Sequence, residues 1–139
     1  MTAVPLTKKQ VENIFNHLRN NQSDLFFEHV ADDVSWTVMG THPLAGVYHG
    51  KKDFISHTFE RLGKIMKDGV MLDITNLLLD GDTAAVEMKS LSTAKNGVPF
   101  NNTYCWIVRF RDGNIVEVRA YLDSALVQKL VDENEVPGT

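Results

Sequence analysis

The fold is decided by the stretch ADDVSWTVMG at residues 31–40, which runs on into THPLAGVYHGK at residues 41–51. Apolar and polar side chains alternate in the first stretch, and this period of two predicts a strand with Trp36 and Val38 on one face. Pro43 and the glycines around it predict a loop after this strand, with room for one short strand inside the loop.

Helical patterns lie on both sides of this strand and loop. Thr7 and Gln10 form a capping-box signature, and the apolar spacing after them predicts a first helix that ends in the polar run 19–22. Ser23 is expected to cap a second helix. The longest helix is predicted at 52–67, directly after the loop.

Beyond the third helix apolar and polar residues alternate, which predicts four strands at residues 70–80, 83–94, 98–111 and 114–122. Asp-Gly and Asn-Gly pairs separate these strands, and such pairs favour hairpins, so the strands should form an antiparallel meander. A closing helix is predicted at 123–133. Three helices followed by a curved sheet form an α+β fold, expected as one domain over 1–139 with an ordered core at about 7–133.

The composition argues against several classes of function. A hydrophobic content of 43% supports a packed core, and a net charge of −4 with no long basic run argues against a nucleic-acid partner. No apolar run is long enough to cross a membrane and no signal peptide is visible, so we expect a cytoplasmic protein. Cys105 is expected to be a small buried hydrophobe, and the histidine spacing predicts no metal and no cofactor.

The order helix, helix, Asp-Asp, aromatic strand, glycine-rich loop, helix resembles the opening of the nuclear transport factor 2-like fold. Its SnoaL-like group, which includes small polyketide cyclases and is related to ketosteroid isomerases, is the most similar. The resemblance covers about 11–131 and implies a cone-shaped, cystatin-like sheet wrapped around the N-terminal helices, with a pocket inside. Because this superfamily hosts many chemistries and also non-enzymes, the fold alone assigns no reaction. Its members commonly dimerise through the sheet, which implies a homodimer with contributions from Tyr104, Arg109, Glu117 and Arg119.

The catalytic groups of two related enzyme classes are not matched in this chain. Ketosteroid isomerases use an Asp base beside a Tyr and a protonated Asp. Those positions fall at Val38, Ile14 and Thr103. Limonene epoxide hydrolases use an Asp-Arg-Asp cluster, whose positions fall at Ala120, Glu87 and Lys89. Neither reaction is therefore implied.

Glu87 and Lys89 are the candidate catalytic pair, because residues two apart on a strand share a face. Inside an aromatic pocket, burial would raise the pKa of the carboxylate and the ammonium would lower it, which suits a general base beside a carbonyl. The apolar alternation over 84–88 leaves the alternative that both lie on a solvated outer face. His42, in the loop over the expected pocket mouth, is a candidate proton shuttle or an exposed loop histidine.

Several side chains are expected to form the walls of the pocket. Trp36 and Trp106 each offer a flat apolar surface with one N–H donor, although both would also suit a core. The complete expected set is Trp36, Val38, Tyr48, Trp106, Val118 and Ala120.

Two functions of different classes remain open. The first is a cofactor-free enzyme that performs isomerase, cyclase or dehydratase-type proton transfer on a small apolar carbonyl compound, polyketide-like or terpenoid-like. The second is a non-catalytic module that binds an apolar ligand or dimerises. The direction in which Glu87 points discriminates between them.

Overall fold

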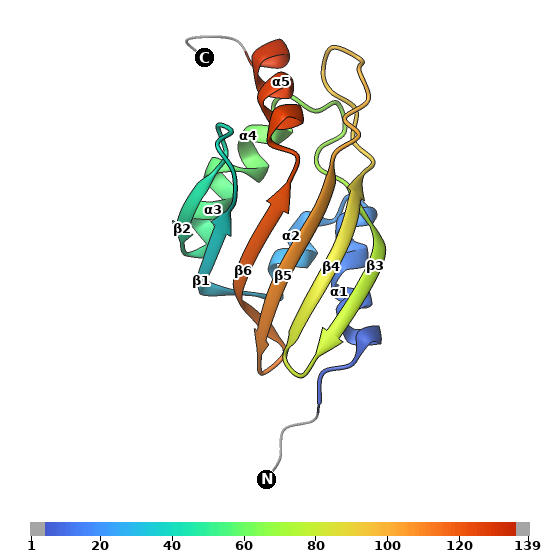
Figure 1. Ribbon diagram of the computed structural model, residues 1–139, viewed down its shortest axis with the longest axis vertical. Helices are drawn as coiled ribbons and strands as arrows, with labels where there is room; N and C mark the ends of the chain where they lie inside the picture. The colour runs from blue at the N-terminus through green and yellow to red at the C-terminus, as the bar shows by residue number, and fades with distance from the viewer. Residues whose placement is uncertain (1–4, 136–139) are drawn as a thin grey trace.

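The computed structural model describes residues 5–135, and within that range helices pack against one curved sheet (Figure 1). The helices are α1 (Lys8–Arg19), α2 (Ser23–Phe27), α3 (Lys51–His57), α4 (Phe59–Gly63) and α5 (Ser124–Asn134). The strands are β1 (Val30–Val38), β2 (Gly46–His49), β3 (Leu72–Asp80), β4 (Thr83–Ser90), β5 (Thr103–Arg111) and β6 (Asn114–Leu122). The ends of the expected domain, 1–4 and 136–139, lie outside the described residues.

The first helix begins as the sequence predicts. The Thr7 hydroxyl accepts a hydrogen bond from the Gln10 backbone N–H at 3.2 Å, and the Gln10 side chain accepts one from the Thr7 backbone N–H at 2.8 Å. This capping box satisfies two N–H groups that have no partner within the helix. The apolar face of α1, which packs into the core, consists of Val11, Ile14, Phe15 and Leu18.

The strands described in residues 5–135 form one sheet in the order β2-β1-β6-β5-β4-β3. The hairpins β3–β4, β4–β5 and β5–β6 are antiparallel, so the predicted meander is confirmed. The pairing of the first strand could not be predicted from turn residues, because a turn links only strands that follow each other in the chain. β1 lies beside β6 and parallel to it, with Trp36 opposite Val118 and Val38 opposite Ala120.

Some strands differ in length from the prediction. The fourth and fifth strands were expected to meet near Asn96, but β4 ends at Ser90 and β5 begins at Thr103. Between them the chain forms a turn with an isolated bridge, Thr93 to Pro99, and backbone hydrogen bonds join Ser90 to Asn102 and Ala94 to Val98 without forming a regular strand pair. The first strand starts earlier than the alternating pattern, at Val30.

The predicted long helix at 52–67 is divided in two at Thr58, which has φ −124° and ψ −77°. The Thr58 hydroxyl donates a hydrogen bond to the Phe54 carbonyl oxygen at 2.7 Å. Such back-bonding from a threonine bends helices, and here it accompanies a complete break. The break lets Phe54 and Phe59, on separate helices, pack at a ring distance of 6.0 Å.

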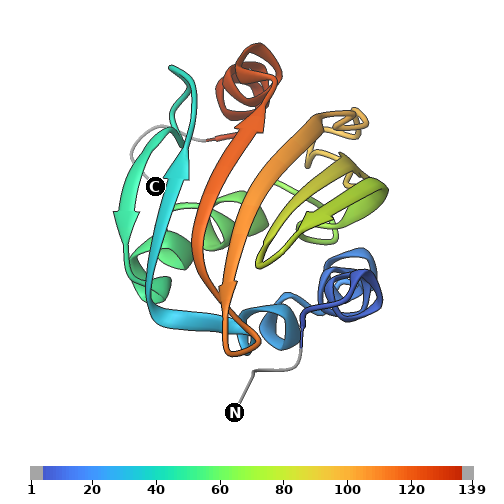
Figure 2. The same ribbon diagram turned by 60° about the horizontal axis from the view of Figure 1, so that its bottom comes forward.

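The curved sheet encloses the core on its concave side, where α1 and α2 lie (Figure 2). Phe15, Phe26 and Trp36 are among the largest fully buried side chains of this core. A second apolar cluster lies beneath α5 and includes Phe100, Val127 and Leu130. The expected α+β class, with a curved sheet around N-terminal helices, is therefore confirmed.

Candidate functional site

An apolar cavity of about 50 Å³ lies between the concave face of the sheet and helices α3 and α4. Side chains of the first and the last strand both line this cavity, because β1 and β6 lie side by side in the sheet. Its lining is Trp36, Val38, His42, Leu44, Phe54, Thr58, Phe59, Leu62, Val70, Leu72, Phe100, Tyr104, Trp106, Ala120, Leu122 and Val127.

The predicted wall residues divide into two groups. Trp36, Val38, Trp106 and Ala120 line the cavity. Val118 is buried on the same strand as Ala120 but does not reach the cavity, and Tyr48 lies in a neighbouring surface groove. The Tyr48 hydroxyl donates to the Leu44 carbonyl oxygen at 2.8 Å, so this tyrosine supports the loop that carries His42.

Glu87 and Lys89 do not face the cavity. Along β4 the buried side chains are Val86 and Met88, whereas Glu87 and Lys89 are exposed on the opposite face. Glu87 instead accepts a hydrogen bond from the Asn76 side-chain amide at 3.0 Å. The expected acid–cation pair inside the pocket is therefore wrong, because the strand's own apolar alternation fixes which face points inward.

His42 lies at the cavity wall, and its side chain is held by the backbone on both sides. It is 5% exposed. Its Nδ1 accepts a hydrogen bond from the Leu44 backbone N–H at 3.2 Å, and its Nε2 donates to the Met39 carbonyl oxygen at 3.0 Å. Burial lowers the pKa of His42 below its ordinary value, and the hydrogen bond to Met39 opposes this by a smaller amount. The ring is thus neutral at pH 7, and the alternative of an exposed loop histidine is excluded.

The lowered pKa of His42 gives a pH-dependent stability. In the unfolded chain His42 binds a proton near pH 6.5, whereas in the folded chain it binds one only at lower pH. We expect the free energy of unfolding to fall as pH drops below about 6.5 and to level off below the folded-state pKa. Urea titrations of the wild type and His42→Gln at about pH 7.5 and pH 5 should show a stability difference that shrinks at the lower pH. A difference that is independent of pH would contradict the neutral, buried ring.

Several of the side chains that line the cavity are aromatic and pack on one another. Trp36 stacks on Phe54, with ring centroids 3.8 Å apart and an angle of 17° between the planes. Trp106 meets Trp36 edge to face, at 5.2 Å and 82°. Among residues 5–135, the only buried side-chain nitrogen and oxygen atoms without a hydrogen-bond partner are the indole nitrogens of these two tryptophans.

Tyr104 is a cavity residue that the sequence interpretation placed elsewhere. It was expected to contribute to a dimer surface, yet its side chain lines the cavity beside Trp106. The sequence could have indicated this position, because residues 104 and 106 are two apart on one strand and must share a face. Burial raises the pKa of the Tyr104 phenol, so it stays neutral. Leu44 and Phe100 come from loops, where no periodic pattern could have indicated them.

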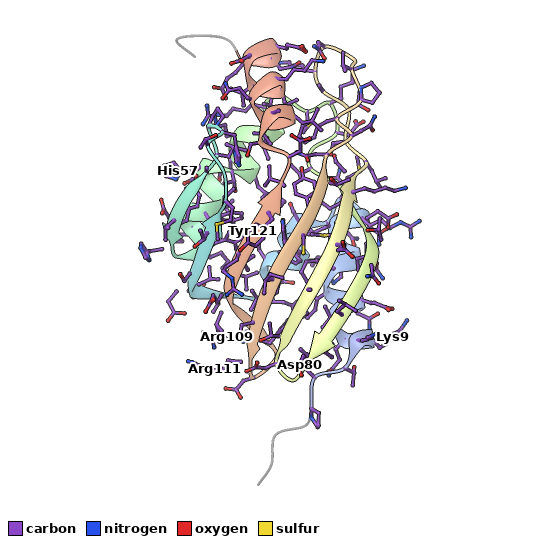
Figure 3. All side chains as sticks on the ribbon, in the orientation of Figure 1. Lys9, His57, Asp80, Arg109, Arg111 and Tyr121 are labelled. Atoms are coloured by element: carbon purple, nitrogen blue, oxygen red, sulfur yellow. The ribbon has the colours of Figure 1, made fainter. Side chains whose placement is uncertain are left out.

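The convex face of the sheet carries charge and scattered apolar groups. Glu117 accepts hydrogen bonds from Arg109 and Arg119, with closest nitrogen–oxygen distances of 3.3 Å and 2.7 Å. Figure 3 shows Arg109 and Tyr121 on the face turned away from α1 and α2. Cys105 is half-buried on this face, less buried than predicted, and burial together with the Glu87 charge raises the pKa of its thiol.

The remaining histidines are dispersed. His57 pairs with Asp53 at 3.1 Å, and His17 stacks on His29 with ring centroids 6.1 Å apart. In the described part of the chain no three His, Cys, Asp or Glu side chains are grouped in a way that could hold a metal ion. The helices described there are all too short or too polar to cross a membrane.

Comparisons with known proteins agree with this geometry. A family model described as "SnoaL-like domain" matches residues 11–118. The chain is 29% identical over 133 residues to the dimerizing cyclase phiC of a fungal species, and 28% identical over 131 residues to the dimerizing cyclase tstC of Talaromyces stipitatus. Each alignment covers 91% of this chain, which spans only 57% of the length of each relative.

The structure is also similar to an NTF2-like protein from Burkholderia thailandensis. The TM-score is 0.75 at 22% sequence identity, and the match covers 88% of this chain and 95% of that chain. At this level of identity the likeness concerns the fold alone.

Proposed function

This chain belongs to the SnoaL-like domain family, and from that membership and the interior cavity we propose that it acts on a small, largely apolar carbonyl compound. The proposed reaction is a cyclase- or isomerase-type proton transfer that needs no cofactor. The similarity of this chain to two proteins named as cyclases supports the reaction class. The observation that carries the proposal is a cavity walled by hydrocarbon and aromatic side chains, with one neutral histidine at its edge.

The size of the cavity restricts how a substrate can bind. Pockets for drug-sized ligands usually measure roughly 300–1,000 Å³, whereas this cavity is about 50 Å³. A polyketide-sized compound therefore needs the aromatic side chains to move apart. Phe59 lies on α4, just beyond the helix break at Thr58, and not on the sheet, so we expect this ring to be the one that moves.

His42 is the proposed proton-transfer group. Its Nδ1 carries the lone pair and has the longer of the two backbone hydrogen bonds. Nδ1 has a single in-plane lone pair, which the Leu44 N–H occupies, so this hydrogen bond must break before Nδ1 can take a proton from the carbon next to the substrate carbonyl. The electron pair of the broken C–H bond then moves onto the carbonyl group. The Met39 carbonyl oxygen, which accepts from Nε2, stabilises the resulting imidazolium. Return of the proton to another atom completes the isomerisation, so no oxidant or reductant is needed.

Deuterium uptake tests this proposal without knowledge of the natural substrate. Cyclopentanone, cyclohex-2-enone and α-tetralone are incubated in D₂O with the protein, and exchange at the carbon next to the carbonyl is followed by NMR. We expect the wild type to accelerate exchange of at least one ketone that binds, and His42→Gln to lose about 100-fold or more of that rate.

Glu87→Gln is the matched control, because it makes the same kind of change on the outer face. It should leave exchange unchanged. A ketone that binds in the cavity but exchanges at the rate seen in buffer would overturn the catalytic proposal.

A non-catalytic ligand-binding module is the second candidate function. It is favoured by a specific observation: in residues 5–135 no carboxylate lines the cavity, and both ring nitrogens of His42 are engaged by backbone groups. Binding of a ketone without any acceleration of exchange is the result that this alternative predicts.

The outer face of the sheet is the proposed homodimer surface. It presents the exposed Tyr121 and the half-buried Ile107 beside the Arg109–Glu117–Arg119 ion pairs. Analytical ultracentrifugation should give twice the chain mass of 15.6 kDa for the wild type and a monomer for Ile107→Lys. Val98→Lys, on the loop between β4 and β5, is the control and should remain dimeric. A monomeric wild type would overturn the proposal.

A further inference from the structure

Two side chains that line the cavity each carry a buried hydrogen-bond donor without an acceptor. The Nε1 atoms of Trp36 and Trp106 contact no protein acceptor within residues 5–135. Trp36 is 0% exposed and Trp106 4% exposed, and both side chains line the cavity. An indole N–H can only donate, so nothing in the side chain itself can satisfy it.

Other buried polar groups of the same region are satisfied. The Thr58 hydroxyl donates to the Phe54 carbonyl, and both ring nitrogens of His42 have backbone partners. Asn102, which is fully buried, exchanges hydrogen bonds with the backbone of Asp123. Because a buried donor without a partner costs about 1–3 kcal/mol, two of them side by side in an otherwise satisfied core require an explanation.

Contacts with neighbouring rings, which for Trp106 include an edge contact with Phe15 at 5.9 Å, do not supply an oxygen or nitrogen acceptor for either donor. Trp36 lies flat on Phe54 at 17°, so its N–H points along the plane of the stack and away from that ring. In the edge-to-face pair of Trp36 and Trp106, only one ring turns its edge toward the face of the other. At most one of the two N–H groups is therefore directed at its partner indole, and an N–H contact with a ring is weaker than one with an oxygen.

We propose that the N–H groups of Trp36 and Trp106 bind the carbonyl oxygen of a ligand in this cavity, an inference that rests on the proposed small-molecule function. A carbonyl oxygen has two lone pairs and can accept from two donors. Among the described residues no Lys or Arg lines the cavity. A buried carboxylate would lack a counter-charge there, so a neutral ketone in a hydrocarbon frame fits better than an acid.

NMR can observe these donors directly, because the chain contains two tryptophans and so gives two indole N–H resonances. Cyclopentanone is titrated into ¹⁵N-labelled protein, and methylenecyclopentane, which replaces the oxygen by a CH₂ group of similar shape, is the control. We expect at least one indole proton to move downfield with the ketone only, as a new hydrogen bond requires. Trp106→Phe assigns the resonances and keeps an aromatic ring in place.

Dissociation constants give the second readout. The preference for cyclopentanone over methylenecyclopentane should fall by about threefold to tenfold in Trp106→Phe, since one hydrogen bond is removed. Leu122→Ala, a cavity variant that keeps both indoles, should leave this preference unchanged.

The possible results separate the two proposals. If both compounds bind and neither moves an indole proton downfield, the carbonyl subsite is wrong while the apolar binding site stands. If neither compound nor any larger ketone perturbs the cavity resonances, the proposed function itself fails. The wild-type titration decides this even if Trp106→Phe does not fold.

Discussion

Replacing Trp36 with alanine should lower the free energy of unfolding by about 3–5 kcal/mol, the range typical of a large aromatic side chain removed from a core. The side chain is fully buried and contacts Phe27, Phe54 and Trp106 through its ring. Its removal takes one packing partner from each of these rings and joins the vacated volume to the existing cavity. Urea denaturation followed by circular dichroism measures the loss.

Two variants control this prediction. Trp36→Phe restores much of the ring volume and should cost clearly less than the alanine variant. Val98→Ala removes apolar atoms at a side chain that is 47% exposed and should change the stability by less than about 0.5 kcal/mol. A loss below about 1 kcal/mol for Trp36→Ala would show that the aromatic cluster does not stabilise the fold in the way that the structure indicates.

Gly40→Ala is expected to cost about 2–3 kcal/mol, the second largest effect. Gly40 has φ +112°, where a side chain is strained, and an added methyl group would collide with Ser124 Oγ and lie 3.0 Å from His42 Cδ2. Because Ser124 opens α5, the substitution pushes the loop away from that helix and disturbs His42. Thermal and urea unfolding give the loss of stability, and the pH dependence attributed to His42 should weaken as well.

Gly97→Ala is the matched control for this site. Gly97 also has a positive φ, +92°, but nothing lies within 4 Å of the added methyl group. Gly97→Ala therefore measures the backbone strain alone, and it should lower the free energy of unfolding by less than Gly40→Ala does. The double variant Gly40→Ala/Ser124→Ala should recover part of the loss, since it removes one colliding atom. Equal losses for the two glycines would contradict the close packing at Gly40.

The features predicted correctly are those determined over a few residues. The Thr7 capping box and the Asp-Gly and Asn-Gly turns act within a few positions, and all of them appear in the structure. The length of the strands was less predictable. Residues 91–102 contain an Asn-Gly pair, and backbone hydrogen bonds still join Ser90 to Asn102 and Ser92 to Phe100, yet the regular strands end at Ser90 and begin again at Thr103. The side chains of Ser92 and Asn102 bind the backbone of Met71 and Asp123, outside this pair of strands.

The candidate site was predictable only in part. The tryptophans follow from alternation, because a strand's period fixes which residues share its inner face. His42 was identified as a candidate, but the two backbone hydrogen bonds that hold its ring depend on the loop's folded path. For Glu87, two kinds of sequence evidence gave different predictions. The comparison with the limonene epoxide hydrolases placed Glu87 at a position of their catalytic cluster, whereas the apolar residues at 84, 86 and 88 predicted that it faces outward. The structure agrees with the apolar alternation.

The parallel pairing of β1 with β6 also has a kinetic consequence. Trp36 and Val118 are opposite each other but 82 positions apart in the chain, so their pairing requires the closure of a long loop. Pairings of this kind are slow relative to hairpins. During synthesis β1 has only β2 as a strand partner until residues 114–122 have been made, so its other hydrogen-bonding edge stays unpaired for that time. We therefore expect the refolding hairpins β3–β4 and β5–β6 to gain hydrogen-exchange protection before β1 does.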